Sequence, residues 1–444
     1  MSIFFFLKKK NFFFGEHNKK KNKKFIRIES NIRLESAEGL EVIPIEIRNR
    51  GIESISQYIL DSSSNSKPNS NLDSNTNMNS KSVSTSDPLF RTKLMVVGFE
   101  NVGKTTILDC LFPIKDVGKT KGKIQEMERL LELQGKYFRK YKSKESSKDF
   151  KEIILENKQW NVQEIKETGL ELIPLNDKTQ NKIEINFKDQ ETRDKWIERL
   201  KRVILNSATH GIEIQNQILQ NQNKLSNVSE LVKSIHSSSD QQNLTPNIDV
   251  SIWDFAGQHD YYNNHHYFLS TRTVFLVLWK MKDEKVGLEG LNFWFKSLSS
   301  HLQHDSTSLA NNKPYFSILV VGTFLDDQNV DKSEESKKLR EQEVLEKAKS
   351  NGIHYPIQIY EVSCSTLENI NGLKQDIYKI ALTHGYMGEK LPIGYLHIKN
   401  SIEKLREDYK ENDIPIVRFQ ELIKECKTNS TFEFDDEFVK RGLK

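Results

Sequence analysis

The residues from Gly98 to Thr105, GFENVGKT, have the types and spacing that bind phosphate. The glycines of this G-x-x-x-x-G-K-T pattern let the backbone curl so that successive N–H groups point toward phosphate oxygens. Lys104 would reach the β- and γ-phosphates, and the Thr105 hydroxyl would bind Mg²⁺. An apolar run precedes the pattern and a helix-like run follows it, as a phosphate loop requires. The predicted phosphate-binding residues are Gly98, Phe99, Glu100, Asn101, Val102, Gly103, Lys104, Thr105 and Thr106.

Two further segments contain groups that phosphoryl chemistry needs. In WDFAGQ, Asp254 ends an apolar strand-like run and can hold Mg²⁺ through water, while Gly257 lets a backbone N–H approach the γ-phosphate. Gln258 can orient the attacking water, because its amide both donates and accepts hydrogen bonds. Thr209, in ATHGIEI, can complete the Mg²⁺ coordination as a switch loop does. The candidate catalytic residues are therefore Lys104, Gly257 and Gln258, and the candidate metal ligands are Thr105, Thr209 and Asp254.

Two later segments predict a preference for guanine. In VVGTFLDD, the Asp326 carboxylate follows a buried strand and can accept hydrogen bonds from N1–H and the 2-amino group of guanine, which adenine cannot supply in that way. In VSCST, small residues let backbone N–H groups meet the base carbonyl. Either segment alone is typical of an ordinary loop, but together they follow successive strands, and ligands bind outside the carboxyl ends of strands in such sheets. The predicted base-binding residues are Thr323, Asp326, Ser363 and Cys364.

The pattern of apolar and polar residues predicts the strands and helices that position these groups. From residue 89 to about 388, near-continuous apolar runs alternate with amphipathic stretches, which predicts a doubly wound α/β domain with a parallel sheet buried on both faces. Strands are expected at 93–98, 248–255, 273–280, 315–322 and 357–363, and helices at 286–302, 335–349 and 367–384.

Other segments depart from this pattern. Residues 119–205 interrupt the α/β domain with several short strand-like runs and one amphipathic helix, which predicts a small β-rich insert. Residues 1–30 are expected to be a disordered basic tail, and 61–88 a Ser/Asn-rich linker with almost nothing to bury. Between them, 31–60 predicts a short strand and a short amphipathic helix around Ile55.

Composition restricts the class of protein. A net charge of +4 over 444 residues gives no argument for a nucleic-acid partner. The three cysteines lie far apart and in no C-x-x-C pair, which argues against a disulfide framework or a zinc site and suits a reducing compartment. We therefore expect a cytoplasmic protein, with weak attraction of the basic tail to anionic membranes as the alternative.

The motifs resemble the Ras-like GTPases and, more closely, the Roc domain of Roco proteins. The resemblance is carried by GFENVGKTTIL, THGIEI, IWDFAGQHDYY and GLEGLNFWFKSL. It implies a P-loop GTPase domain over 89–388, a remnant of a leucine-rich-repeat exit over 31–60, and an α-rich, truncated COR domain over 389–444. The end of the insert, FKDQETRDKWIERLKRVI, resembles the last strand and closing helix of a pleckstrin-homology domain. The chain departs from most Ras-like proteins in having Thr323 and Phe324 where an Asn-Lys pair is usual.

This resemblance implies a GTP-binding protein that hydrolyses GTP to GDP with Mg²⁺ and acts as an intracellular signalling switch. Protein effectors or regulators at the switch loops, and a homodimer formed through COR, are the implied partners. Hydrolysis is expected to be slow, because no arginine finger can be assigned. Two alternatives stay open: a nucleotide-binding scaffold without hydrolysis, and a membrane adaptor whose insert binds phosphoinositide through Lys136, Arg139, Lys140 and Lys142.

Overall fold

The described chain consists of two units. The computed structural model describes residues 47, 54–55, 57–58, 88–121, 126–143, 148–156, 159–175, 181–205, 209, 211–220, 246–257, 268–302, 314–408, 417–428 and 436–442. The larger unit contains Phe90–Thr307 and Pro314–Gly385, and the smaller contains Met1–Leu89, Ser308–Lys313 and Tyr386–Lys444. Among the described helices, none has both the length and the apolar character needed to span a membrane. The expected tail (1–30) and nearly all of the expected linker (61–88) lie outside the described residues.

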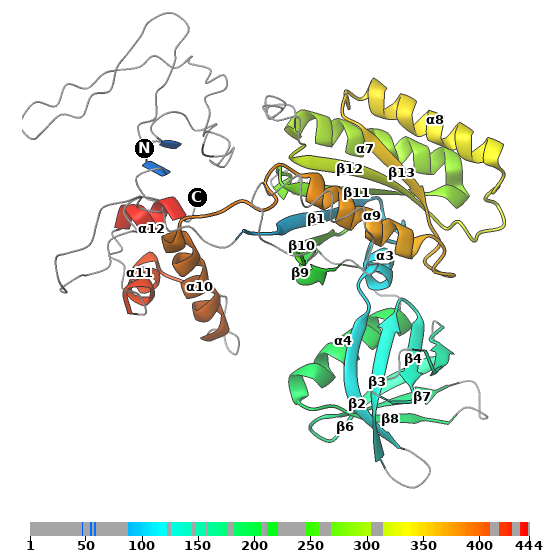
Figure 1. Ribbon diagram of the computed structural model, residues 1–444. Helices are drawn as coiled ribbons and strands as arrows, with labels where there is room; N and C mark the ends of the chain where they lie inside the picture. Colours follow the sequence, from blue (N-terminus) through cyan, green and yellow to red (C-terminus); the bar gives the residue numbers. More distant parts are fainter. Residues whose placement is uncertain are drawn as a thin grey trace, which may run out of the picture. The chain divides into compact units, whose positions relative to one another are not determined.

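The larger unit is organised around a six-stranded sheet with the order β13-β12-β11-β1-β10-β9 (Figure 1). Five of these strands run parallel, and the edge strand β9 pairs antiparallel with β10. The strands are β1 (Arg91–Gly98), β9 (Ile212–Leu219), β10 (Ile248–Phe255), β11 (Thr273–Lys280), β12 (Phe316–Thr323) and β13 (Ile357–Glu361). The prediction of a doubly wound α/β fold is confirmed, and β9 adds an antiparallel edge that the sequence pattern did not reveal.

Helices cover both faces of this sheet. Helices α7 (Glu284–Leu302) and α8 (Glu334–Ser350) pack together on one face, and α3 (Lys104–Leu111) and α9 (Ile370–Thr383) lie on the other (Figure 1). Seven of the eight residues of β11 are buried, because a central strand has a helix layer on each side. The carboxyl ends of the parallel strands therefore meet at one edge, where loops are free to hold a ligand.

The insert forms a second sheet within the same unit. Its seven strands are antiparallel in the order β5-β4-β3-β2-β8-β7-β6, and α4 (Gln190–Leu205) packs against β6 and β7. The strands are β2 (Ile114–Lys121), β3 (Glu126–Gln134), β4 (Tyr137–Tyr141), β5 (Phe150–Ile154), β6 (Trp160–Ile165), β7 (Gly169–Pro174) and β8 (Ile183–Asn186). Strand β2 begins at Ile114, so the sheet starts before the predicted boundary at residue 119. The pleckstrin-like character of the insert stays a prediction.

Trp196 of α4 is the centre of the insert core. Its ring is fully buried and stacks on Phe187 at 5.5 Å between centroids, and it meets Phe138 edge-on at 6.2 Å. The indole Nε1–H donates to the Asp116 carboxylate at 2.8 Å, so the polar edge of the ring is satisfied inside the core. The tryptophan predicted to lie in the closing helix is therefore a packing residue.

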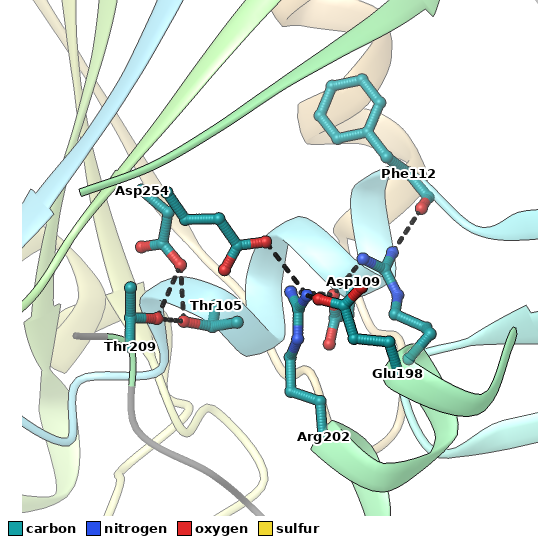
Figure 2. Close-up of polar contacts among 9 residues, drawn as sticks. Thr105, Asp109, Phe112, Glu198, Arg202, Thr209 and Asp254 are labelled. Carbon is teal, nitrogen blue, oxygen red and sulfur yellow. Dashed lines mark hydrogen bonds and ion pairs between the residues drawn. The ribbon is translucent and has the colours of Figure 1, made fainter. Parts of the chain in front are cut away.

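A buried ion pair joins the insert to the phosphate-loop helix. Arg199 of α4 contacts the Asp109 carboxylate of α3 at 2.6 Å and donates to the Phe112 carbonyl at 2.7 Å (Figure 2). Arg202, one turn further, lies 3.8 Å from Asp109 and donates to Glu213 of β9 at 3.0 Å. Burial raises the pKa of Asp109 to about 6, against the opposing charges of the two arginines.

The smaller unit has a helical core of its own. Helices α10 (Ile393–Asp408), α11 (Phe419–Thr428) and α12 (Asp436–Gly442) contribute to one apolar cluster. The described residues of the predicted helix near Ile55 are helical, and Ile55 is buried. Tyr58 donates its hydroxyl to the Lys390 carbonyl at 3.2 Å, so this segment is tied to the chain just before α10.

The buried pair generates a prediction about stability. Asp109→Ala should lower the free energy of unfolding by about 3 kcal/mol, because it leaves Arg199 buried without its counter-charge. Guanidinium denaturation followed by circular dichroism measures the change. Asp149→Ala is the control, because both side chains of the Asp149–Lys142 pair are exposed. This pair should contribute less than about 1 kcal/mol to the free energy of unfolding. Equal losses in the two variants would contradict a special role for Asp109.

Candidate functional site

The phosphate loop connects β1 to α3. Gly103 is the N-cap of α3 and has a φ of 88°, in the left-handed region where glycine is favoured. Asn101 also has a positive φ, 58°, so the loop curls tightly. No side chain caps the helix, and the first N–H groups of a helix have no acceptor within it. This end of α3 can therefore donate several backbone hydrogen bonds to an anion.

Lys104 is held beneath the loop. Its Nζ donates to the carbonyls of Gly98 at 3.0 Å and Phe99 at 2.8 Å, and the residue is 7% exposed. Burial lowers the pKa of Lys104 to about 8, although Asp254 and Glu100 oppose that shift. An added Cβ on Gly257 would collide with Lys104 Nζ and come within 2.7 Å of the Phe99 carbonyl, so only glycine allows this approach.

The three predicted metal ligands meet at one point, although they come from different elements (Figure 2). The hydroxyls of Thr105 and Thr209 lie 2.6 Å apart, and they lie 2.6 Å and 3.0 Å from Asp254 Oδ2, respectively. Thr105 is in the first turn of α3, Asp254 is in β10, and Thr209 lies just before β9.

Asp254 has an unused oxygen in this cluster. The residue is 1% exposed, and its Oδ1 makes no hydrogen bond within the described part of the chain. Burial raises the pKa of Asp254 above its ordinary value, and the two threonine hydroxyls offset part of the rise. A buried carboxylate with a free oxygen beside two hydroxyls is an oxygen-donor set of the kind that Mg²⁺ prefers. The residues therefore fit a bound Mg²⁺.

At the base end, Asp326 is positioned by Ser363. The Ser363 hydroxyl donates to Asp326 Oδ1 at 2.6 Å and accepts from the Thr366 N–H at 3.0 Å. Asp326 is exposed and Ser363 is fully buried, so a buried hydroxyl orients an exposed carboxylate. The carboxylate keeps its other oxygen for a ligand.

Thr323 has a different environment from the one expected of a base contact. It is 2% exposed, and its hydroxyl lies 2.8 Å from the Val102 carbonyl and 3.2 Å from the Trp279 carbonyl. It thus fastens the phosphate loop to β11. The next residue, Phe324, has a φ of 64°, and Lys282 Nζ lies 4.5 Å from its ring centroid.

One cavity of about 530 Å³ connects the phosphate loop to the base end, a volume typical of small-molecule sites. Of the predicted residues, Gly98, Phe99, Val102, Asp254 and Ser363 do not line this cavity, and Gln258 lies outside the described residues. The predicted residues that line the cavity are Glu100, Asn101, Gly103, Lys104, Thr105, Thr106, Thr209, Gly257, Thr323, Asp326 and Cys364. The other lining residues were not among the predicted site residues: they are Lys136, Lys280, Lys282, Phe324 and Ser365, of which Ser365 belongs to the VSCST segment.

Residues 206–314 match the family model described as Ras of Complex, Roc, domain of DAPkinase. This stretch of the chain is therefore similar to the Roc domain of Roco proteins. This confirms the resemblance stated from the motifs. Roc domains are Ras-like GTPase domains, so the match supports a guanine nucleotide as the ligand of the cavity.

Curated relatives of the Roc domain are much longer proteins. The chain is 33% identical over 180 residues, 40% of its length, to the probable serine/threonine-protein kinase pats1 of Dictyostelium discoideum, of which it covers 5%. It is 24% identical over 76% of its length to the probable serine/threonine-protein kinase roco5 of the same organism, of which it covers 9%. The leucine-rich repeat serine/threonine-protein kinase 1 of Caenorhabditis elegans is 24% identical over 42% of the chain, which covers 8% of that protein. The chain thus spans less than a tenth of each.

Among solved structures, the chain is similar to Methanosarcina barkeri Roco2 RocCORdC bound to GDP. The TM-score is 0.38 and the sequence identity 15%, over 82% of this chain and 69% of that one.

The burial of Lys104 generates a prediction about pH. Triphosphate affinity should be greatest below pH 8 and fall by about tenfold per pH unit above it, because the neutral amine no longer attracts phosphate. A competition titration with a fluorescent GTP analogue from pH 7 to pH 9 measures this. Lys104→Arg is the matched control: it keeps its charge and experiences the same titration of the nucleotide. Lys104→Ala should abolish binding, and wild-type affinity that follows the Arg variant at every pH would refute the assignment.

Proposed function

We propose that this chain binds GTP, hydrolyses it to GDP with Mg²⁺ and acts as an intracellular signalling switch. The observation that carries the proposal is the convergence of Thr105, Thr209 and Asp254 beneath the phosphate loop. A helix, a strand and a separate loop segment place hydroxyl and carboxylate oxygens together, and a divalent cation bound with phosphate is the ligand that satisfies them. The Roc match supports the choice of guanine nucleotide.

Each residue has a distinct task in this proposal. Backbone N–H groups of the loop and Lys104 would hold the phosphates, and Thr105, Thr209 and Asp254 would hold Mg²⁺, which would neutralise phosphate charge. The Gly257 N–H approaches the γ-phosphate, and Gln258 orients the attacking water. None of the described residues that line the cavity is an arginine, and we expect slow hydrolysis for this reason.

The switch rests on the adjacency of two segments. Thr209 lies just before β9, and Gly257 follows β10, while Ile212 and Phe255 are directly paired between these strands. Loss of the γ-phosphate would release both segments at the same edge. On edge strand β9, Ile214 and Ile218 are 52% and 56% exposed, which gives a protein effector or regulator an apolar surface to contact.

We also propose how the chain is divided into domains. We assign residues 89–388 to the Roc domain, with the insert beginning at Ile114, residues 31–60 to a leucine-rich-repeat exit, and residues 389–444 to the beginning of COR, through which a homodimer would form. A reducing, cytoplasmic location suits the three free cysteines.

Phosphoinositide binding by the insert has less support. Arg139 is paired with Glu132 and Glu152, and Lys142 with Asp149, which leaves less free charge for a lipid headgroup.

The choice of base is tested at Asp326. Asp326→Asn replaces one acceptor oxygen with a donor, which should repel the 2-amino group of guanine and pair with the 2-oxygen of xanthine. We expect GTP affinity to fall by roughly tenfold or more and XTP affinity to rise, since an unpaired polar group under the base costs about 1–3 kcal/mol. Competition by GTP, ATP and XTP against one labelled nucleotide measures this on both proteins. If ATP competes as well as GTP on wild type, the GTPase proposal fails.

Hydrolysis is tested at Gln258. Gln258→Leu should leave GTP affinity nearly unchanged and slow single-turnover hydrolysis by about a hundredfold, because the side chain acts on water in the transition state. Phosphate release after mixing with excess protein gives the rate. The control is Gln342→Leu, on an exposed face of α8. Undetectable hydrolysis by wild type that binds GTP would instead favour the scaffold without hydrolysis.

A further inference from the structure

The β3–β4 turn of the insert lies against the base end of the nucleotide cavity. Lys136, at the tip of this turn, lines the same cavity as Asp326, Cys364 and the phosphate loop. Sequence reasoning assigned Lys136 to a lipid-binding surface, because nothing in the sequence connects it to Asp326 or Cys364, which lie far later in the chain. The structure instead brings it to the nucleotide site.

Backbone contacts fix the turn against the end of α3. The Gly135 N–H donates to the Asp109 carbonyl at 3.1 Å, and Gln134 Nε2 donates to the Cys110 carbonyl at 2.9 Å. Gly135 has a φ of 54°, and an added Cβ would lie 2.7 Å from Cys110 Sγ. A glycine is therefore needed both for the backbone conformation and for the close approach.

Side chains then tie the turn to the segment expected to meet the base. The Tyr137 hydroxyl donates to the Ser365 carbonyl at 2.5 Å, and Lys136 Nζ donates to the Ser365 hydroxyl at 3.1 Å. Ser365 belongs to the VSCST segment, whose backbone N–H groups are expected at the base carbonyl. Within the described residues, Lys136 forms no ion pair, so its ammonium group has donors left for a ligand.

The chemistry of the bases determines what a cation at this point would favour. Guanine presents two acceptors on one edge, O6 and N7, and a lysine suits them. Adenine presents a donor amino group in place of O6, which an ammonium group repels.

We propose that Lys136, carried by the inserted unit, is a guanine-recognition residue that contacts the O6/N7 edge while Asp326 reads the adjoining N1–H and 2-amino groups. This inference rests on the proposed function, because it assumes a guanine nucleotide in the cavity. It makes the insert a component of the nucleotide site: the turn completes the base pocket, and the bound base holds the turn in place.

The test compares GDP and ADP on the full chain, by competition against a fluorescent GDP analogue with Mg²⁺ present. Lys136→Met keeps most of the apolar stem and removes the charge. It should weaken GDP on the order of tenfold and should not weaken ADP, because the ammonium group repels the adenine amino group, so that the preference for guanine shrinks. Lys136→Arg should retain the preference. Lys151→Met on the neighbouring strand β5 is the control, because it removes one exposed lysine of the same sheet outside the cavity.

The outcomes separate the inference from the function on which it rests. Selective loss of GDP in Lys136→Met, with rescue by Arg, supports the inference. Equal weakening of GDP and ADP would mean that Lys136 acts only on the structure of the pocket, and this overturns it. Unchanged GDP binding in the Met variant, with wild type still preferring GDP, overturns it while the proposed function stands. Wild type that binds GDP no better than ADP overturns both.

Discussion

The buried contact between Asp109 and Arg199 fixes how the two sheets of the larger unit meet. Helix α3 has only eight residues, with Lys104 and Thr105 at its start and Asp109 at its end. A charge buried this deeply needs a partner, and the insert helix supplies it. The phosphate-loop helix and the insert are thereby joined. Hydrogen bonds from Gly135 and Gln134 to the carbonyls of Asp109 and Cys110 then hold the β3–β4 turn, and with it Lys136, at the cavity.

The phosphate end of the cavity holds two buried ionisable groups of opposite sign. Burial lowers the pKa of Lys104 and raises the pKa of Asp254, so the charged form of each is less stable here than it would be in water. Phosphate would stabilise the charged lysine, and a divalent cation would stabilise the charged carboxylate. Both pKa shifts have the direction expected of a site in which bound phosphate and a bound cation stabilise the charged side chains. The base end differs, because Asp326 is exposed and depends on Ser363 for its orientation.

The local pattern of apolar residues was sufficient to predict most strands of the central sheet. The five predicted strands begin and end within two residues of those observed, since buried parallel strands are apolar along their whole length. Strand β9 alternates isoleucine with polar residues, but its first residues belong to the ATHGIEI segment around Thr209. That segment was interpreted as a switch loop, so no strand was predicted there. The insert boundary was set too late because β2, IKDVGKTK, carries too few apolar residues to stand out as a strand.

The sequence by itself determined the chemistry of the phosphate site, because a phosphate loop is a contiguous pattern whose glycines and lysine act through local backbone geometry. It also determined the order of the strand ends that follow, from which the guanine hypothesis and the Roc resemblance were drawn. Only the tertiary structure decided which distant side chains meet there. Thr209 reaches Thr105 across 104 positions, Thr323 fastens Val102 across 221, and Lys136 reaches Ser365 across 229. Such contacts depend on how one sheet packs against another, and no spacing along a single chain encodes that distance.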